Sequence, residues 1–432
     1  MNDGRSPAPA PAGLSAAAVA ALFGAFAATY FLSALLRAVT ATLAPVFSAE
    51  LGLTAGHLGL LAGAFFLGFA AMQLPLGRAL DRFGPRRTLL VLLALAMLGC
   101  IAFAHAGGLG SLVLSRMLIG VGVSACLMAP LTSYRRWLTP MAQLRANSWM
   151  LMTGSLGMVA STLPVQWLLP LLGWRGVFWG LAGLLALATG LVAWFVPRDA
   201  APPAAAGGSA GPERGTYGQI VRHRLFVRMA PAGFFIYGGL IAVQALWAGP
   251  WMTRVAGLDA GAAARGLFAI NVAMLFTFMT WGMVLPRLAR RGIDALRLMR
   301  WGLPVCLAVL LGNLWLGPAA GAWHWAAWCV ACSFVSVSQP AVGAAFPTAR
   351  AGRALSAFNL VIFSGVFSTQ WGIGLLVDAA LALGAGNVAA YRVAFGVFAA
   401  CSLASYLWLL REPAPVADNP DSSRRPSSSL ET

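Results

Sequence analysis

Two arginines interrupt long apolar stretches of this chain, and they are its clearest candidates for binding chemistry. Arg37 lies within the apolar stretch 18–44 and Arg116 within the stretch 111–133. An arginine inside a membrane span costs about 3 kcal/mol even on lenient insertion scales, so each should face a cavity or a polar partner. Neither has an acidic residue nearby in its stretch. Because guanidinium groups bind carboxylate-like anions in a bidentate way, the pair favours an anionic solute or counter-ion.

Arg37 belongs to a polar stripe. Tyr30, Ser33, Arg37 and Thr40 recur at three- and four-residue steps, which places them on one face of a helix. We interpret this face as the lining of a pore. The alternatives are that Arg37 extends to the membrane surface and that Arg116 only donates hydrogen bonds to carbonyl groups of a neighbouring helix.

The second half of the chain offers a similar set of polar and aromatic residues. Tyr237, Gln244 and Trp247 follow a helical stripe within the stretch 224–252. Aromatic and amide groups of this kind suit a cavity that binds a solute and then releases it. Trp251, nearer the end of the stretch, is expected in the interfacial aromatic belt. Isolated amides that either line the cavity or form hydrogen bonds between helices are Asn271, Gln339, Asn359 and Gln370.

The composition predicts that these residues lie on membrane helices. The 432-residue chain is 59% hydrophobic and only 9% charged, whereas soluble domains carry about 25% charged residues. The apolar stretches are long enough to cross a bilayer as helices, and they lack the alternation of barrel strands. We therefore expect an all-α integral membrane protein with twelve transmembrane helices at 18–44, 56–77, 87–106, 111–133, 147–170, 175–196, 224–252, 262–286, 297–317, 322–347, 354–381 and 390–410.

The chain divides near its middle. A Pro, Ala, Gly and Ser-rich stretch without apolar periodicity separates two sets of six spans. The predicted parts are a disordered cytoplasmic N-terminus (1–17), a six-helix half (18–196), a cytoplasmic linker (197–223), a second six-helix half (224–410) and a disordered cytoplasmic tail (411–432).

The net charge of +17 does not indicate nucleic-acid binding. All 29 basic residues are Arg, and they gather in alternate loops, which is the positive-inside pattern rather than one basic face. This distribution places both termini in the cytoplasm. Only four arginines fall in predicted outer loops, namely Arg175, Arg254, Arg265 and Arg392.

The sequence gives little support for a metal site or for enzyme activity. All six cysteines fall inside apolar spans, and Cys329 and Cys332 have metal-ligand spacing without a second pair, so packing thiols are the better interpretation. Methionine clusters would suit copper, but Met is also a common gap-filler. No hydrolase, protease or nucleotide-binding motif is present. We expect no enzyme activity, no cofactor and no metal site.

A charged segment at 77–87 reads Gly-Arg-Ala-Leu-Asp-Arg-Phe-Gly-Pro-Arg-Arg. We expect a short loop at the inner membrane surface. Gly77 would allow close helix approach, Gly84 would form the turn, and Asp81 could accept hydrogen bonds from a helix N-terminus or a neighbouring Arg. An ordinary positively charged turn is the alternative. The residues assigned to this predicted gating loop are Gly77, Asp81, Arg82, Gly84, Arg86 and Arg87.

The spacing of this segment resembles the signature loop between helices 2 and 3 of the major facilitator superfamily. Residues 116–122, an Arg followed by Gly-x-Gly, resemble the helix 4 motif of that family, and the six-plus-six layout is also similar. The resemblance implies a monomeric bacterial inner-membrane transporter whose halves rock around a midplane site. It also implies that Asp81 acts on the conformational balance rather than on substrate binding.

The sequence therefore predicts a secondary transporter of a small organic solute, with an anion favoured. Alternatives are an exporter of a neutral or amphipathic compound, a receptor-like protein that does not transport, and, with less support, a copper transporter. Helix 5 lacks the Gly-Pro-rich antiporter pattern, which argues against drug/proton antiport. No acid lies at the centre of a span, so Glu50, Asp81 and Asp378 near the membrane edges are the candidates for proton coupling, with a counter-anion as the alternative.

Overall fold

The structure is a computed structural model that describes residues 15–198 and 217–411, and within these ranges it is helical without strands. The segments predicted to be disordered, 1–17 and 411–432, lie outside the described residues at 1–14 and 412–432, as does the predicted linker at 199–216. A helix already begins at Ala16, within the first of these segments. The linker residues that are described include a short helix, α9 (Tyr217–Val221).

The helices of each half follow the predicted spans. The first half contains α1 (Ala16–Leu51), α2 (Ala55–Ala71), α3 (Gln73–Phe83), α4 (Pro85–Ala104), α5 (Leu109–Val123), α6 (Met128–Trp137), α7 (Pro140–Ala160) and α8 (Leu163–Phe195). The second half contains α10 (Arg224–Ala232), η1 (Gly233–Tyr237), α11 (Gly238–Ala242), η2 (Val243–Trp247), α12 (Ala248–Arg254), α13 (Ala260–Arg290), α14 (Ala295–Leu316), η3 (Gly317–Ala319), α15 (Ala322–Cys332), η4 (Ser333–Val337), α16 (Ser338–Ala344), α17 (Thr348–Ala382) and α18 (Asn387–Leu410).

Ten helices in the described ranges are long and apolar enough to cross a membrane, or eleven when α2 and α3, bent by 45°, form one span. The predicted fifth span accounts for the difference from twelve. It corresponds to α7 together with the first part of α8, and Gly173, with φ of +61°, divides α8 into two helices. The chain is a multi-pass membrane protein, while the exact number of twelve crossings stays a prediction.

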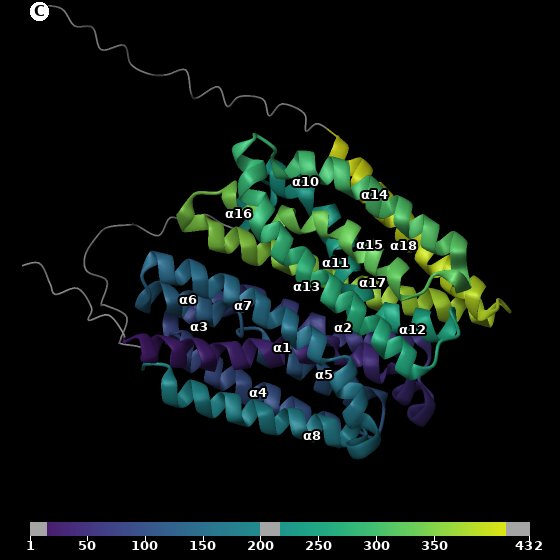
Figure 1. Cartoon of the computed structure of the whole chain (residues 1–432), viewed down its shortest axis with the longest axis horizontal. Coiled ribbons are helices and arrows are strands. Elements are labelled where there is room, and N and C mark those ends of the chain that lie inside the picture. The colour runs from purple at the N-terminus through teal and green to yellow at the C-terminus, as the bar shows by residue number, and fades with distance from the viewer. Residues whose placement is uncertain (1–14, 199–216, 412–432) are drawn as a thin grey trace, which may run out of the picture.

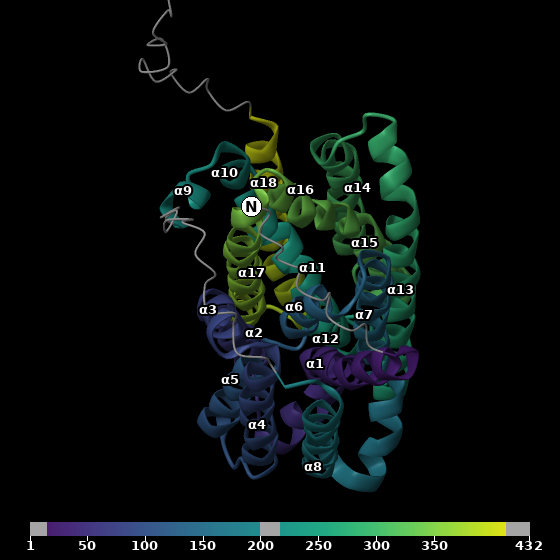
Figure 2. The ribbon, with the colours of Figure 1, turned by 90° about the vertical axis from the view of Figure 1, so that its left-hand side faces the viewer.

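The two halves lie side by side as separate helical bundles (Figure 1; first half purple to blue, second half green to yellow). Helix α17 of the second half runs along α2 and α3 of the first half, and α13 lies beside α7 (Figure 2). Helix α1 contacts η2 and α12 across the same boundary. We call the end of the bundles that holds Gly84 the predicted inner end, and the end that holds Glu50 the predicted outer end.

The prediction that residues 77–87 form a loop is wrong, because nearly all of them are helical. Gly77, Asp81 and Arg82 lie within α3, and only Gly84 separates α3 from α4. The reason is packing, because Leu76 and Leu80 are buried and hold this segment as an amphipathic helix.

The turn itself has the expected form, since Gly84 has φ of +80° and Pro85 begins the next helix. Gly77, by contrast, has no atom close to the position that a Cβ would occupy. The expected close approach of helices at Gly77 is therefore wrong.

Close helix approach occurs at other glycines. A Cβ at Gly120 of α5 would overlap the carbonyl oxygen of Phe65 on α2, and a Cβ at Gly68 would overlap that of Met117 on α5. Backbones that approach so closely gain dispersion contacts that lipid cannot replace, which is how small residues stabilise membrane helix pairs. The α2–α5 contact therefore fixes the core of the first half.

The α2–α5 contact predicts a stability effect. Replacing Gly120 by Ala should lower the thermal unfolding temperature of the detergent-purified protein, because the added methyl group costs ~1–3 kcal/mol of overpacking where it meets Phe65. Gly180 lies within α8 with no atom near its Cβ position, so Gly180→Ala is the matched control and should leave the unfolding temperature unchanged or raised. Equal effects of the two substitutions would contradict this account.

Candidate functional site

Arg116 is completely buried within the first half. It projects from α5, donates one hydrogen bond to the carbonyl oxygen of Leu36 on α1 (2.9 Å), and lies over the ring of Phe65 on α2 (5.1 Å to the centroid). Within the described ranges, its Nε and second terminal nitrogen have no hydrogen-bond partner. Arg116 thus joins α1, α2 and α5, as in the alternative considered from the sequence, and it keeps two unused donors.

Arg37 is less buried than Arg116 and lies at the boundary between the halves. Its guanidinium group lies over the ring of Phe69 on α2 (5.7 Å), and its buried Nε has no hydrogen-bond partner among the described residues. The Tyr30 hydroxyl of the same helix interacts with it, and Tyr237 of the second half is close enough to interact electrostatically with both. Residues of both halves therefore surround this cation.

The remaining residues of the α1 stripe are buried. Tyr30 packs against Gly154 of α7, where a Cβ would lie 2.9 Å from the tyrosine Cζ. The Ser33 hydroxyl is 3.5 Å from the carbonyl oxygen of Val123, and Thr40 is 2% exposed. The side chains of Tyr30 and Arg37 thus interact. The Ser33 hydroxyl instead donates a long hydrogen bond to Val123, a residue of the first half.

The seventh predicted span is not a regular α-helix. Two of its segments, η1 and η2, are π-helical, and they contain Tyr237, Gln244 and Trp247. π-Helical turns inside α-helices are rare and frequently occur at functional sites. All three stripe residues predicted from the sequence therefore lie in irregular turns, which periodicity alone could not show.

Gln244 and Asn271 pair with each other. The Gln244 side-chain amide donates to the Asn271 side-chain oxygen (2.9 Å), and Asn271 donates in turn to the carbonyl oxygen of Leu267 (2.9 Å). Both side chains are buried, at 6% and 3% exposure. This pair connects the seventh and eighth spans.

The indole N–H groups of Trp247 and Trp251 also donate hydrogen bonds. Trp247 donates to the backbone carbonyl of Gln370 on α17 (3.1 Å), while both polar atoms of the Gln370 side chain are buried without partners. Trp251 donates to the carbonyl oxygen of Ala320 (3.1 Å) and is completely buried. The expectation that Trp251 belongs to an interfacial belt is therefore wrong, since it packs within an aromatic cluster with Trp325 and Phe395.

Asn359 takes part in an amide chain that crosses the boundary between the halves. Gln339 donates to the Asn359 side-chain oxygen, and the Asn359 amide is 3.5 Å from the side-chain oxygen of Gln73 on α3. Gln73 is only 4% exposed. Gln73 is not among the residues predicted from the sequence, although a lone amide at the end of an apolar stretch is a usable signal.

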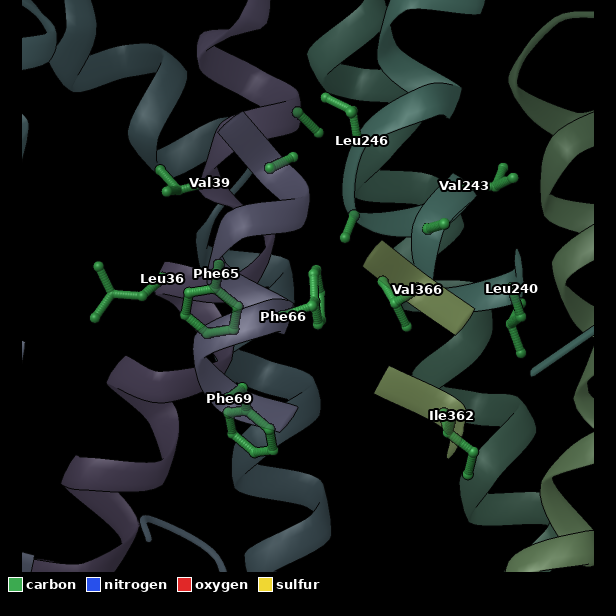
Figure 3. Close-up of a cluster of buried hydrophobic side chains, with 14 of the residues drawn as sticks. Leu36, Val39, Phe65, Phe66, Phe69, Leu240, Val243, Leu246, Ile362 and Val366 are labelled. Carbon is green, nitrogen blue, oxygen red and sulfur yellow. The ribbon is translucent and has the colours of Figure 1, made fainter. Parts of the chain in front are cut away.

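An apolar cluster lies between the halves beside Arg37. Figure 3 shows Phe66 and Phe69 of the first half near Val366 and Ile362 of the second half, whereas Leu36 and Val39 point away from the second half. Phe363 stacks on Phe66 (6.2 Å between centroids) and contacts Phe69 (4.6 Å). The ring of Phe69, which lies under Arg37, therefore belongs to an aromatic contact between the halves.

Of the five described acids, four have partners elsewhere, and the fifth, Asp81, is exposed. Glu50 pairs with Arg175 and accepts from Trp174; Asp378 accepts from backbone N–H groups of α2. Asp259 and Asp294 cap the helices that follow them. Among the described residues no carboxylate therefore neutralises Arg37 or Arg116, and an anion that entered between the halves would meet an uncompensated cation.

The predicted gating residues occupy the predicted inner end. Asp81, Arg82 and Arg87 are exposed. Arg86 donates to the carbonyl oxygen of Ala193 on α8 (2.6 Å), which joins the third and sixth spans. No hydrogen bond or ion pair reaches Asp81 from the described residues.

Comparison with known proteins identifies the protein family to which the chain is similar. Residues 26–367 match the family model of the Major Facilitator Superfamily. The chain is 30% identical over 122 residues to a probable sulfoacetate transporter, SauU, of Cupriavidus necator, a match that covers 28% of each protein. It is 27% identical over 161 residues to the 4-hydroxybenzoate transporter PcaK of Acinetobacter baylyi, which covers 36% of this chain and 34% of that protein.

A third relative, the chloramphenicol resistance protein of Streptomyces lividans, is 33% identical over 173 residues, which covers 39% of this chain and 43% of that protein. The chain thus spans less than half the length of each of these three relatives.

Solved structures show the same fold. A bacterial homologue of the human lysosomal transporter Spinster, in an inward-facing and unoccupied conformation, superposes with a TM-score of 0.75 at 17% identity and covers 92% of this chain and 97% of that one. A D-xylose–proton symporter superposes with a TM-score of 0.74 at 14% identity, with 91% and 97% covered.

The Gln244–Asn271 pair predicts non-additive substitutions. Gln244→Leu and Asn271→Leu should each destabilise the purified protein, and the double variant should lose less than the sum of the two, because the second change removes a group that has already lost its partner. Hydrogen bonds between membrane helices contribute about 0.6 kcal/mol on average, so a coupling of that size is expected. Thermal or denaturant unfolding of the four proteins measures it, and strictly additive losses would contradict a direct bond.

Proposed function

Because the chain belongs to the Major Facilitator Superfamily, we propose that it is a secondary transporter of a small organic anion that works by alternating access. The two helical halves with a shared boundary match the requirement for a site that faces one side of the membrane at a time.

The observation that carries this proposal is the environment of Arg37. Its guanidinium group lies between the halves, has an unused buried donor, and has aromatic and phenolic neighbours but no carboxylate from the part of the chain that the structure describes. A carboxylate or sulfonate would supply the missing acceptors through charge-assisted hydrogen bonds. Tyr30 and Tyr237 would add donors from the two halves, so that binding depends on both.

The other residues have supporting roles in this proposal. Arg116 is closed off within the first half and bonded to Leu36, so it raises the positive potential near α1 rather than touching the solute. Trp247 and Phe69 provide aromatic walls, and Gln244 is held by Asn271. Gln370 and Asn359 supply amide groups on α17.

Two relatives support the choice of an anion. The names of SauU and PcaK specify transport of sulfoacetate and of 4-hydroxybenzoate, and both compounds are small organic acids. Their matched segments are short, so they support a solute class and not a particular solute.

The positive-inside pattern supports an inner-membrane location with both termini in the cytoplasm, and a monomer fits the family. In the proposal a proton or a counter-anion supplies the driving force. Since no acid lies at the centre of a described span, exchange against another anion accounts for coupling without an intramembrane carboxylate.

A second candidate is export of a neutral or amphipathic compound. The observations that favour it are the similarity to a chloramphenicol resistance protein and the apolar, aromatic cluster between the halves. Such a solute would bind to the aromatic surfaces, and it would gain little from Arg37.

A ligand screen decides between the two candidates. The purified protein would be tested by thermal shift against sulfoacetate, 4-hydroxybenzoate, aliphatic mono- and dicarboxylates, and chloramphenicol, and hits would then be followed in proteoliposomes. Stabilisation by an organic acid supports the first candidate. Stabilisation by chloramphenicol alone, unaffected by Arg37→Gln, would support the second.

Arg37→Gln should abolish stabilisation by the organic acid that the screen identifies, or weaken its binding by at least about tenfold, which corresponds to ~1.4 kcal/mol. The reason is that glutamine removes the charge that the solute would neutralise. Arg37→Lys should recover part of the affinity because it keeps a charge without the bidentate geometry. Unchanged affinity in Arg37→Gln, with the protein folded, would contradict the assignment of Arg37.

Asp81→Asn should leave solute affinity nearly intact and slow turnover in proteoliposomes, because Asp81 is exposed at the predicted inner end, away from Arg37. Asp294 is a suitable control, since it is also exposed near that end but only caps α14. Asp294→Asn keeps a good cap residue and should turn over normally. A large loss of affinity in Asp81→Asn with normal turnover would refute this role.

A further inference from the structure

Asp378 connects the two halves at the predicted outer end. It projects from α17, and its two carboxylate oxygens accept hydrogen bonds from the backbone N–H groups of Ala55 (3.0 Å) and Gly56 (2.8 Å) at the start of α2. Thr54 caps the next N–H group of the same helix, that of His57. One half thus supplies the helix end and the other supplies the anion.

The interaction is electrostatically favourable for two reasons. The N-terminus of a helix carries a partial positive charge, which stabilises an anion within the first turn. Hydrogen bonds to an ionised acceptor are also roughly twice as strong as neutral ones. When α2 and α17 separate, both contributions are lost together, and Ala55 and Gly56 need water as the replacement acceptor.

Glycines bring α2 and α17 close enough for this contact. A Cβ at Gly56 would lie 2.7 Å from the Asp378 carboxylate, and a Cβ at Gly59 would overlap the carbonyl oxygen of Gln370. On the other helix, a Cβ at Gly374 would overlap the carbonyl oxygen of Ala55. The outer parts of the two helices therefore touch backbone to backbone with Asp378 at the end of the contact.

Other acids at this end do not cross the boundary. Glu50 pairs with Arg175 and Trp174, and all three belong to the first half. Asp259 caps α13 through the N–H group of Ala262 within the second half. Of these three acids, only Asp378 loses its partners when the halves move apart.

A cavity of about 490 Å³ lies on the outer side of this contact. Its lining comes from both halves and includes Ser48 and Leu58 of the first half and Arg254, Asp378 and Tyr391 of the second. Asp378 and the first turn of α2 thus lie at the place where this cavity would have to widen for a solute to pass from the outer side to Arg37.

We propose that Asp378 is the positioning residue of an outer gate: by holding the N–H groups of Ala55 and Gly56, its carboxylate keeps the predicted outer ends of α2 and α17 together, and these bonds break when the outer side opens. The inference rests on the proposed function, because a gate has meaning only for a carrier that alternates. It assigns to Asp378 a role in the conformational step and no contact with the solute.

The test is a distance measurement across the cavity. Spin labels would be attached to cysteines introduced at Ser48 and Asn387, which line the cavity from opposite halves, and the distance distribution would be measured by pulsed electron paramagnetic resonance in lipid nanodiscs. Protein without the two introduced cysteines reports any labelling of the native thiols.

Asp378→Asn should shift the distribution to longer distances. Asparagine keeps one acceptor oxygen but places an amide donor against the second N–H group, so the charge and one of the two bonds are lost. Because a hydrogen bond to a charged group contributes more than a neutral one, the ratio of open to closed populations should rise about tenfold or more.

Asp259→Asn is the matched control, since it changes an outer-end acid that caps its own helix and leaves a residue that caps equally well. Its distance distribution should equal that of the parent. An unchanged distribution in Asp378→Asn, or an equal shift in Asp259→Asn, would overturn the proposal.

A second variant acts on the same contact without touching a charge. Gly59→Ala places a methyl group against the backbone of Gln370 and should also lengthen the distances, whereas Gly24→Ala, with no atom near its Cβ position, should not. If Asp378→Asn fails to fold, Gly59→Ala decides, and an unchanged distribution there counts against the gate.

The measurement needs no solute, so its failure and that of the proposed function are distinguishable. A shift without any identified anion supports the gate while the solute class is wrong. Anion binding that depends on Arg37, together with distances that do not respond to Asp378, refutes the gate and leaves the carrier proposal standing.

Discussion

A guanidinium group removed from water must find acceptors for its N–H groups, and this requirement governs the centre of the molecule. Arg116 finds one carbonyl oxygen, that of Leu36, and an aromatic ring, and it is sealed inside the first half. Arg37 finds a phenol and an aromatic ring at the boundary between the halves. Arg116 therefore links helices within one half, whereas Arg37 lies where the two halves meet.

The boundary between the halves combines contacts of different strength. Apolar side chains such as Phe66 and Phe363 meet without directional bonds, and such surfaces can slide or separate at modest cost in a bilayer. Polar contacts lie on either side of them, with the amide chain through Asn359 toward the predicted inner end and Asp378 at the predicted outer end. A carrier needs this distribution, because each end must be stable when closed and must also be able to open.

The sequence predicted the helical spans well because hydrophobic length alone determines them, as for α13 (Ala260–Arg290) and α18 (Asn387–Leu410). It also predicted that Tyr30 and Arg37 share one helix face, and in the structure the two side chains interact. It failed where structure depends on contacts between distant segments. The bonds from Ala55 and Gly56 to Asp378 join residues more than 300 positions apart, and the burial of Gln73 depends on α17. Local periodicity contains neither fact.

The two π-helical segments of the seventh span have a geometric consequence for movement. A π turn holds one residue more than an α turn, so if η2 became α-helical, the part of the helix beyond it would rotate by about 100° about its own axis. The side chain of Trp247, at the end of η2, would then turn away from α17 and contact a different helix. The length of the helix would hardly change. Rotation within this one helix would thus reorient the Trp247 side chain without any rigid-body motion of the helical bundle.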